Sequence, residues 1–152
     1  LLNMAQEIKR ELALVATVPP APSLHRAQSL HLSVHPVHSS VVVYPSGTNV
    51  VVRDLASGFD APPLFSFRHA AATTVARFSP NGLFVASGDK DGNVVIWANR
   101  PETTEKYKSR QLGGAIRDIA WTDDNERLLI VGEGRGEYAS IITVSGSSLG
   151  DV

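Results

Sequence analysis

The side chains with the potential for chemistry in this 152-residue chain include His69, Ser87 and Asp91, the three residue types of a serine-hydrolase triad. A serine nucleophile of that kind sits on a sharp turn between a strand and a helix, flanked as Gly-x-Ser-x-Gly. Ser87 lacks those flanking glycines and lies within a run that predicts a strand. We therefore expect a structural role for the three residues, no enzymatic activity and no small-molecule substrate.

Three histidines within eight residues, His31, His35 and His38, suggest a metal site. Pro36 interrupts the segment, and the alternation of side chains along a strand puts only His31 and His35 on one side. A fourth ligand is missing, and the chain has no cysteine to supply a thiolate. We predict no metal here, and solvent-exposed histidines at the edge of a sheet instead.

A glycine-rich segment, Gly132-Glu-Gly-Arg-Gly136, follows another predicted strand. It lacks the Gly-x-Gly-x-x-Gly spacing of nucleotide-binding loops, and Glu133 places a carboxylate where a phosphate would lie. A strand follows it, so no helix N-terminus is available for an anion. No phosphate-bearing ligand or other cofactor is predicted.

The charge of the chain excludes further classes of partner. Its 14 basic and 15 acidic residues are scattered and give a formal net charge of −1. We therefore expect neither a nucleic-acid site nor a polybasic membrane anchor. The longest apolar runs are far shorter than the roughly 20 residues that span a bilayer. The absence of cysteine fits the cytosol best.

A repeat of 43 or 44 residues organises these side chains. Pro36 and Pro80 are 44 positions apart, and Phe78 and Trp121 are 43 apart, each at the end of a β-branched or aromatic run. Each unit reads as strand, turn, strand, turn, strand, with Asp91-Gly92 as the clearest turn. A period of this length is typical of a WD40-type β-propeller, in which each four-stranded blade is one repeat.

The predicted fold is therefore all-β, an incomplete WD40-type β-propeller of about 2.7 blades, given the 40 to 45 residues of one repeat. We predict a lead-in over residues 1–29, a degenerate first blade over 30–68, the clearest blade over 69–112 and a truncated third blade over 113–152. An incomplete ring leaves strand edges exposed, so we expect the chain to need further blades.

The middle unit resembles the WD repeat, in which a histidine, a serine or threonine, an aspartate and a tryptophan form one hydrogen-bonded chain. The matching residues are His69, Ser87, Asp91 and Trp97. Buried polar groups must find partners inside the blade, so such a network stabilises the turn.

The third unit resembles the early blades of the actin-interacting protein 1 family. The resemblance rests on Ile116-Arg-Asp-Ile-Ala-Trp-Thr122, on the run from Arg127 to Arg135, and on Ser145-Gly-Ser-Ser-Leu-Gly150. It implies an N-terminal fragment of a cytoplasmic protein of the actin cytoskeleton. Family members carry two propellers, bind actin filaments decorated by cofilin or actin-depolymerising factor, and promote filament disassembly.

Within that resemblance, Glu133, Arg135 and Glu137 are the candidate contacts with actin or cofilin, and a solvated turn is the alternative. Two departures from the family affect this segment: Gly136 is an extra residue, and Thr143-Val144 replaces a Trp-Asp pair. The rival functions are a WD-repeat scaffold unrelated to actin and, less well supported, a propeller enzyme.

Overall fold

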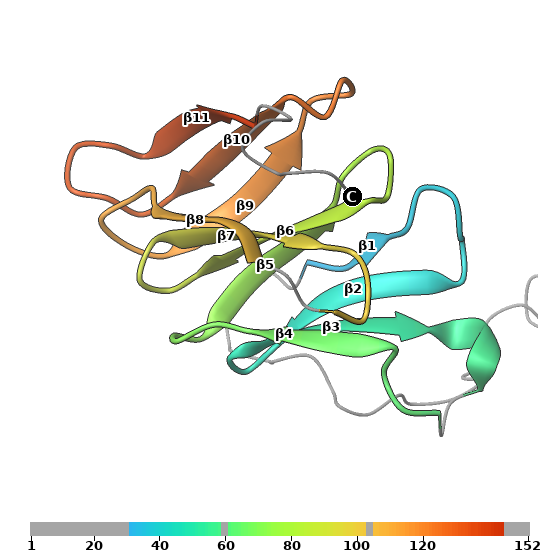
Figure 1. Ribbon diagram of the computed structural model, residues 1–152. Helices are drawn as coiled ribbons and strands as arrows, with labels where there is room; N and C mark the ends of the chain where they lie inside the picture. Colours follow the sequence, from blue (N-terminus) through green and yellow to red (C-terminus); the bar gives the residue numbers. More distant parts are fainter. Residues whose placement is uncertain (1–30, 59–60, 103–104, 145–152) are drawn as a thin grey trace, which may run out of the picture.

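The computed structural model describes residues 31–58, 61–102 and 105–144, which form three antiparallel sheets in succession along the chain (Figure 1). The first sheet contains, in spatial order, β1 (Ser33–Val34), β2 (Val41–Ser46), β3 (Asn49–Asp54) and β4 (Phe65–Arg68). The second contains β5 (Thr73–Phe78), β6 (Phe84–Asp89), β7 (Asn93–Ala98) and β8 (Glu105–Arg110). The third contains β9 (Ile116–Trp121), β10 (Arg127–Gly132) and β11 (Ala139–Thr143).

The predicted all-β architecture is confirmed. The described residues contain one short 3-10 turn besides the strands, η1 (Leu55–Ser57), which begins where the Asp54 carboxylate accepts from the Ala56 amide at 2.9 Å. None of the helical structure in this part of the chain is long and apolar enough to cross a bilayer. The predicted lead-in, residues 1–29, lies outside the described residues.

The sheets lie face to face, with their first strands β1, β5 and β9 beside one another (Figure 1). One apolar cluster joins the first and second sheets and includes Val43, Val52, Phe67, Val85 and Trp97. A second joins the second and third sheets and includes Val75, Ile96, Ile116, Leu128 and Ile130. All six residues of β6 are buried, because the middle sheet is covered on both faces.

Backbone hydrogen bonds show where two of the strands end. The first strand, β1, has two residues. After it the His35 amide donates to the Val41 carbonyl at 2.8 Å, and the Val41 amide donates to the His38 carbonyl at 2.9 Å, which closes the turn to β2. The outer strand of the second sheet ends at Arg110 and does not reach Leu112, because the amides of Gln111 and Leu112 both donate to the Gly92 carbonyl. The pairing of β7 with β8 therefore ends where the chain crosses to the third sheet.

The prediction of exposed histidines was wrong for His31, whose side chain is 15% exposed, and for His35, which is buried. Its Nδ1 accepts from the amides of Val37 and His38, each at 3.1 Å, and its ring meets the Phe78 ring edge-on. The ring also lies against Gly82 of the next sheet. His35 therefore joins the β1–β2 turn to the β5–β6 turn, a contact that strand alternation does not predict.

Replacing Gly82 with alanine is expected to cost about 1–3 kcal/mol of unfolding free energy. A Cβ there would lie 2.5 Å from His35 Cε1, on a backbone with φ of +74°. Gly47→Ala is the matched control: its φ is +61°, and no atom lies within 4 Å of the added Cβ. Urea unfolding should show the larger loss for Gly82→Ala, and an equal loss would contradict the inter-sheet contact.

Candidate functional site

A buried polar network joins the second sheet to the loop that precedes it. His69 Nδ1 lies 3.1 Å from Asp89 Oδ2, and His69 Nε2 lies 2.7 Å from Ser87 Oγ. The Trp97 indole Nε1–H donates to the same Ser87 Oγ at 2.7 Å. With the proton on Nδ1, histidine donates to the carboxylate and accepts from the serine hydroxyl, so every polar group has a partner.

The prediction of Asp91 as the acidic member of this network was wrong, and Asp89 holds that place. Asp91 is exposed at the tip of the β6–β7 turn, and its backbone amide donates to Asp89 Oδ1 at 3.0 Å. Ser87 and Asp89 are two positions apart on one strand, so both face His69. A two-residue period counted from Ser87 reaches both aspartates, and what separates them is that the strand ends at Asp89, so Asp91 already lies in the turn.

Hydrogen bonds hold Asp89 in its charged form. Burial raises the pKa of its carboxyl, but donors from the Asn93 side chain and backbone and from His69 outweigh this, so the pKa lies below its ordinary value. Burial lowers the pKa of His69 despite the opposing effect of the Asp89 carboxylate. The folded network therefore combines an ionised Asp89 with a neutral His69.

The three residue types and distances match a hydrolase triad, but the environment does not. Ser87 is fully buried, and the side chains of His69 and Asp89 are 1% exposed. The Ser87 oxygen already accepts from Trp97 and lies within a strand covered on both faces. A substrate has no path to this oxygen, so the network acts as a structural support.

The depressed histidine pKa values predict a loss of stability in acid. Burial lowers the pKa of both His35 and His69, so the unfolded chain binds protons that the folded chain does not. Stability should be fully present above about pH 6.5, the ordinary histidine pKa, and should decrease as the pH falls through the folded values. Thermal unfolding at a series of pH values checks this, and equal or higher stability in mild acid would contradict it.

The predicted contact loop, residues 132–137, leads from β10 to β11. It lies at the opposite end of β10 from the β9–β10 turn, which contains Asp123 and Asp124. Its base is held by two backbone hydrogen bonds, Gly132 N–H to the Tyr138 carbonyl at 2.9 Å and Glu133 N–H to the Ala115 carbonyl at 2.8 Å. Glu133 is also ion-paired with Arg117, whose Nε lies 3.0 Å from its carboxylate. Glu133 is thus tied to the third sheet.

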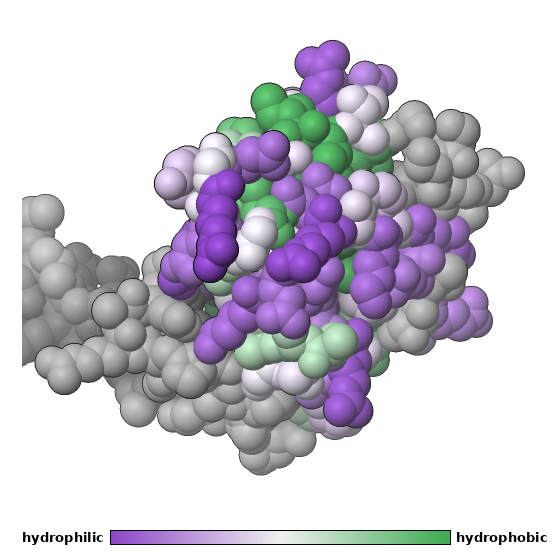
Figure 2. Space-filling model, turned by 90° about the vertical axis from the view of Figure 1, so that its left-hand side faces the viewer, coloured by the Kyte–Doolittle hydropathy of each residue, from purple (hydrophilic) through white to green (hydrophobic). Residues whose placement is uncertain are grey.

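Arg135 and Glu137 are exposed on the same loop. Within residues 31–58, 61–102 and 105–144, neither side chain makes a hydrogen bond or an ion pair. The side of the molecule on which this loop lies is mostly hydrophilic, with hydrophobic surface gathered at the level of the third sheet (Figure 2). Of the three predicted contacts, Arg135 and Glu137 therefore have side chains available to a partner.

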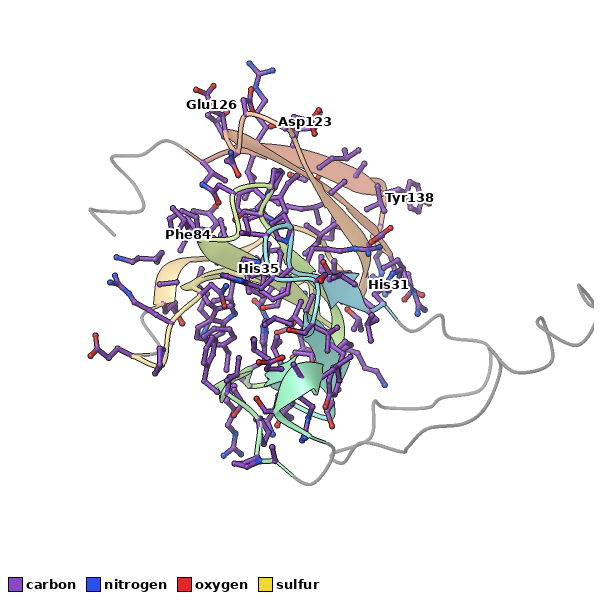
Figure 3. The ribbon with its side chains drawn as sticks, turned by 90° about the vertical axis from the view of Figure 1, so that its right-hand side faces the viewer. His31, His35, Phe84, Asp123, Glu126 and Tyr138 are labelled. Carbon is purple, nitrogen blue, oxygen red and sulfur yellow. The ribbon has the colours of Figure 1, made fainter. Side chains whose placement is uncertain are left out.

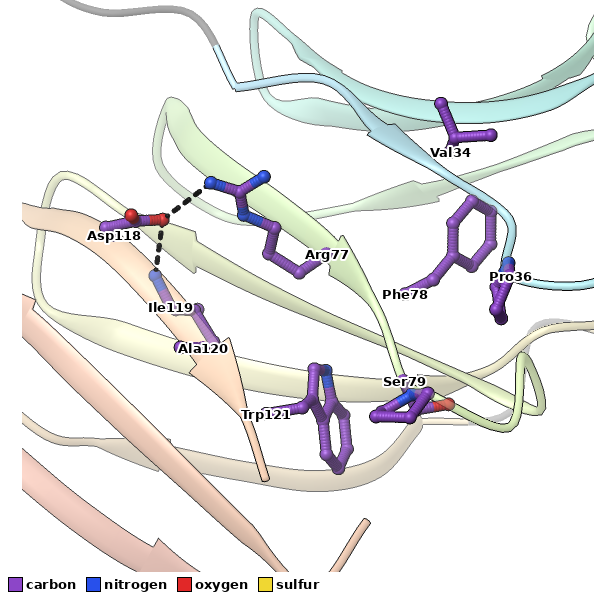
Figure 4. Close-up of a pocket in the computed structure, with 10 residues that line it drawn as sticks. Val34, Pro36, Arg77, Phe78, Ser79, Asp118, Ile119, Ala120 and Trp121 are labelled. Atoms are coloured by element: carbon purple, nitrogen blue, oxygen red, sulfur yellow. Dashed lines mark hydrogen bonds and ion pairs between the residues drawn. The ribbon is translucent and has the colours of Figure 1, made fainter. Parts of the chain in front are cut away.

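A cavity of about 310 Å³ lies between the first strands of the three sheets (Figure 4). Arg77 of β5 crosses it to Asp118 of β9, with Nη2 3.1 Å from Oδ1, and the Phe78 and Trp121 rings line its other end. The pair neutralises its own charge and joins two sheets. Among the described residues, no group of three His, Cys, Asp or Glu side chains could hold a metal ion.

The comparisons with known proteins agree with the repeat and the sheets. The family model of the WD domain, G-beta repeat, matches residues 62–98. A crystal structure of a mitotic checkpoint complex superposes with a TM-score of 0.65 over 85% of this chain and 40% of that chain, at 15% identity. At this identity the likeness concerns the fold alone. Together with the three sheets, it defines the chain as part of a WD40 β-propeller.

Two relatives are more similar to this chain in sequence than the checkpoint structure is. WD repeat-containing protein 1-A of Xenopus laevis is 38% identical over 114 residues, covering 72% of this chain and 18% of that protein. WD repeat-containing protein 1 of Gallus gallus is 32% identical over 155 residues, covering 99% and 24%. The chain thus spans less than a quarter of the length of these relatives. They are actin-interacting protein 1 orthologues, so the chain belongs to that family, and the predicted resemblance is confirmed.

Proposed function

We propose that the protein carrying these blades binds actin filaments and promotes their cofilin-dependent disassembly, without enzymatic activity. The relation to WD repeat-containing protein 1 over up to 99% of the chain is the observation that supports it. The proposed partners are actin filaments and cofilin, which would place the protein in the cytoplasm, at the actin cytoskeleton. This chain would contribute blades and one contact loop.

The proposed mechanism is recognition of a protein surface by shape and charge. Arg135 and Glu137 are exposed charges of opposite sign, two positions apart, on a loop whose base is fixed to the third sheet. Such charges select a complementary surface and orient its approach. Glu133 supports the loop through Arg117 and would add its remaining oxygen to the contact. The alternative, a scaffold unrelated to actin, rests on the same fold and the same loops.

Reversing both free charges, with Arg135→Glu and Glu137→Lys, is expected to weaken binding to cofilin-decorated filaments several-fold, because each contact becomes a like-charge contact. The net charge is unchanged. The control pair, Asp123→Lys and Arg127→Glu, makes the same exchange at the β9–β10 turn, at the other end of β10 (Figure 3). Co-sedimentation of the intact protein with filaments, with and without cofilin, measures the effect.

The outcomes separate the two functions. Cofilin-dependent sedimentation that is reduced by the loop exchange and not by the control supports the actin role and the loop. Equal sedimentation of the wild-type protein with and without cofilin would contradict the actin role and favour the scaffold. Equal losses for both exchanges would contradict the assignment of the loop.

A further inference from the structure

Tyr138 is an exposed aromatic residue at the end of the contact loop. Its relative exposure is 67%, while its carbonyl is fixed by the Gly132 amide. The side chain points away from the third sheet (Figure 3). A phenol ring carries a large apolar area and a hydroxyl that needs a partner, so its exposure on a fixed backbone suits a residue that becomes buried on binding.

The loop presents this ring in a defined geometry. A Cβ at Gly134 would collide with the Glu137 carbonyl, and Gly136 has φ of +101°, so the two glycines allow a tight path that other residues would strain. Just beyond the ring, Ser140 Oγ donates to Gln111 Oε1 at 3.0 Å. A loop held in this way loses little conformational entropy when a partner binds.

The setting of Tyr138 differs from that of the other exposed apolar residues of the third sheet. Leu129 and Ile141 are paired across β10 and β11 on its outer face, as apolar residues are on the sheet faces that pack together. Tyr138 precedes β11 and directly follows Glu137, with Arg135 three positions earlier on the same exposed loop. An aromatic anchor with charges around it is the usual composition of an interface hot spot.

We infer that Tyr138 is the anchor of this loop for a protein partner that offers an apolar pocket, with a carboxylate beside it for Arg135. The inference rests on the proposed function and adds to it the residue that contributes most of the loop's binding energy. The charges of Arg135 and Glu137 orient the approach of the partner. Once the Tyr138 ring is buried in the partner's pocket, it slows dissociation of the complex.

The test compares variants of the intact protein in co-sedimentation with cofilin-decorated filaments. Tyr138→Ala should weaken binding about tenfold or more, as loss of an anchor does. Tyr138→Phe, which keeps the ring, should bind within about threefold of wild type, because one neutral hydrogen bond contributes little. Leu83→Ala is the control, since Leu83 is 47% exposed on the β5–β6 turn at the other end of the sheets. Thermal unfolding of each variant shows whether the fold is retained.

A photo-reactive phenylalanine derivative at position 138 gives a second readout, with the same group at position 83 as control. Cross-links from position 138 to actin or cofilin support the anchor, and cross-links within the unbound protein would overturn it. Wild-type affinity of Tyr138→Ala would overturn the anchor and leave the proposed function standing. Equal wild-type sedimentation with and without cofilin would overturn the proposed function, and no wild-type binding at all would overturn both.

Discussion

Replacing Asp89 with alanine is expected to lower the free energy of unfolding by about 3–5 kcal/mol, the usual cost of removing one partner from a buried charged network. The Asp89 carboxylate accepts from His69, from the Asn93 side chain and from the amides of Asp91 and Asn93. Alanine would leave the buried His69 ring and the partly buried donors of Asp91 and Asn93 without this acceptor. Urea unfolding followed by tryptophan fluorescence measures the loss.

Asp91→Ala is the matched control for Asp89. Asp91 is exposed, and its side chain is not part of the network, so its removal should change stability by less than about 0.5 kcal/mol. Asp89→Asn keeps the shape but loses the charge and should lie between the two. Equal losses for Asp89→Ala and Asp91→Ala, or a larger loss for Asp91→Ala, would show that the network is assigned to the wrong aspartate.

Replacing Trp97 with alanine should cost about 3–5 kcal/mol, because a large buried ring is lost and a cavity remains. Trp97 is 6% exposed and stacks on Phe67 of the first sheet, with ring centroids 4.8 Å apart and an interplanar angle of 12°. The same indole donates to Ser87. The substitution therefore weakens both the contact between the sheets and the network within the second sheet.

Trp121 is the comparison for the hydrogen bond that the Trp97 indole donates to Ser87. Its indole nitrogen is buried without a partner among the described residues. Trp97→Phe should therefore cost about 1–3 kcal/mol, because Ser87 loses a donor, whereas Trp121→Phe removes an unsatisfied group and should cost less. Thermal unfolding of the two variants tests the difference. A larger loss for Trp121→Phe would contradict the role of the Trp97 indole.

The repeat was readable from the sequence because local signals mark it. The turns at Gly47 and Gly92 need positive φ, and β-branched runs such as Asn49–Asp54 favour strands on both sides. These signals act between residues close in the chain. Fold class, blade order and most strand positions could therefore be predicted without the structure.

The network was predictable in part. His69, Ser87 and Trp97 were identified from the WD pattern, while the choice between Asp89 and Asp91 depended on which carboxylate faces the histidine. Both aspartates flank the same turn, so their residue types do not separate them. The structure separates them, because β6 ends at Asp89 with its side chain facing His69, whereas Asp91 lies in the turn.

Along the chain, the sequence by itself determined the repeat, the sheets and the residue types of the buried network, because these depend on local periodicity and turn chemistry. Only the tertiary structure decided that His35 packs against Gly82 and that Glu133 is tied to Arg117. Each of these facts depends on the relative placement of segments from different repeats or strands. Packing between sheets sets that placement, and a period along the chain does not encode it.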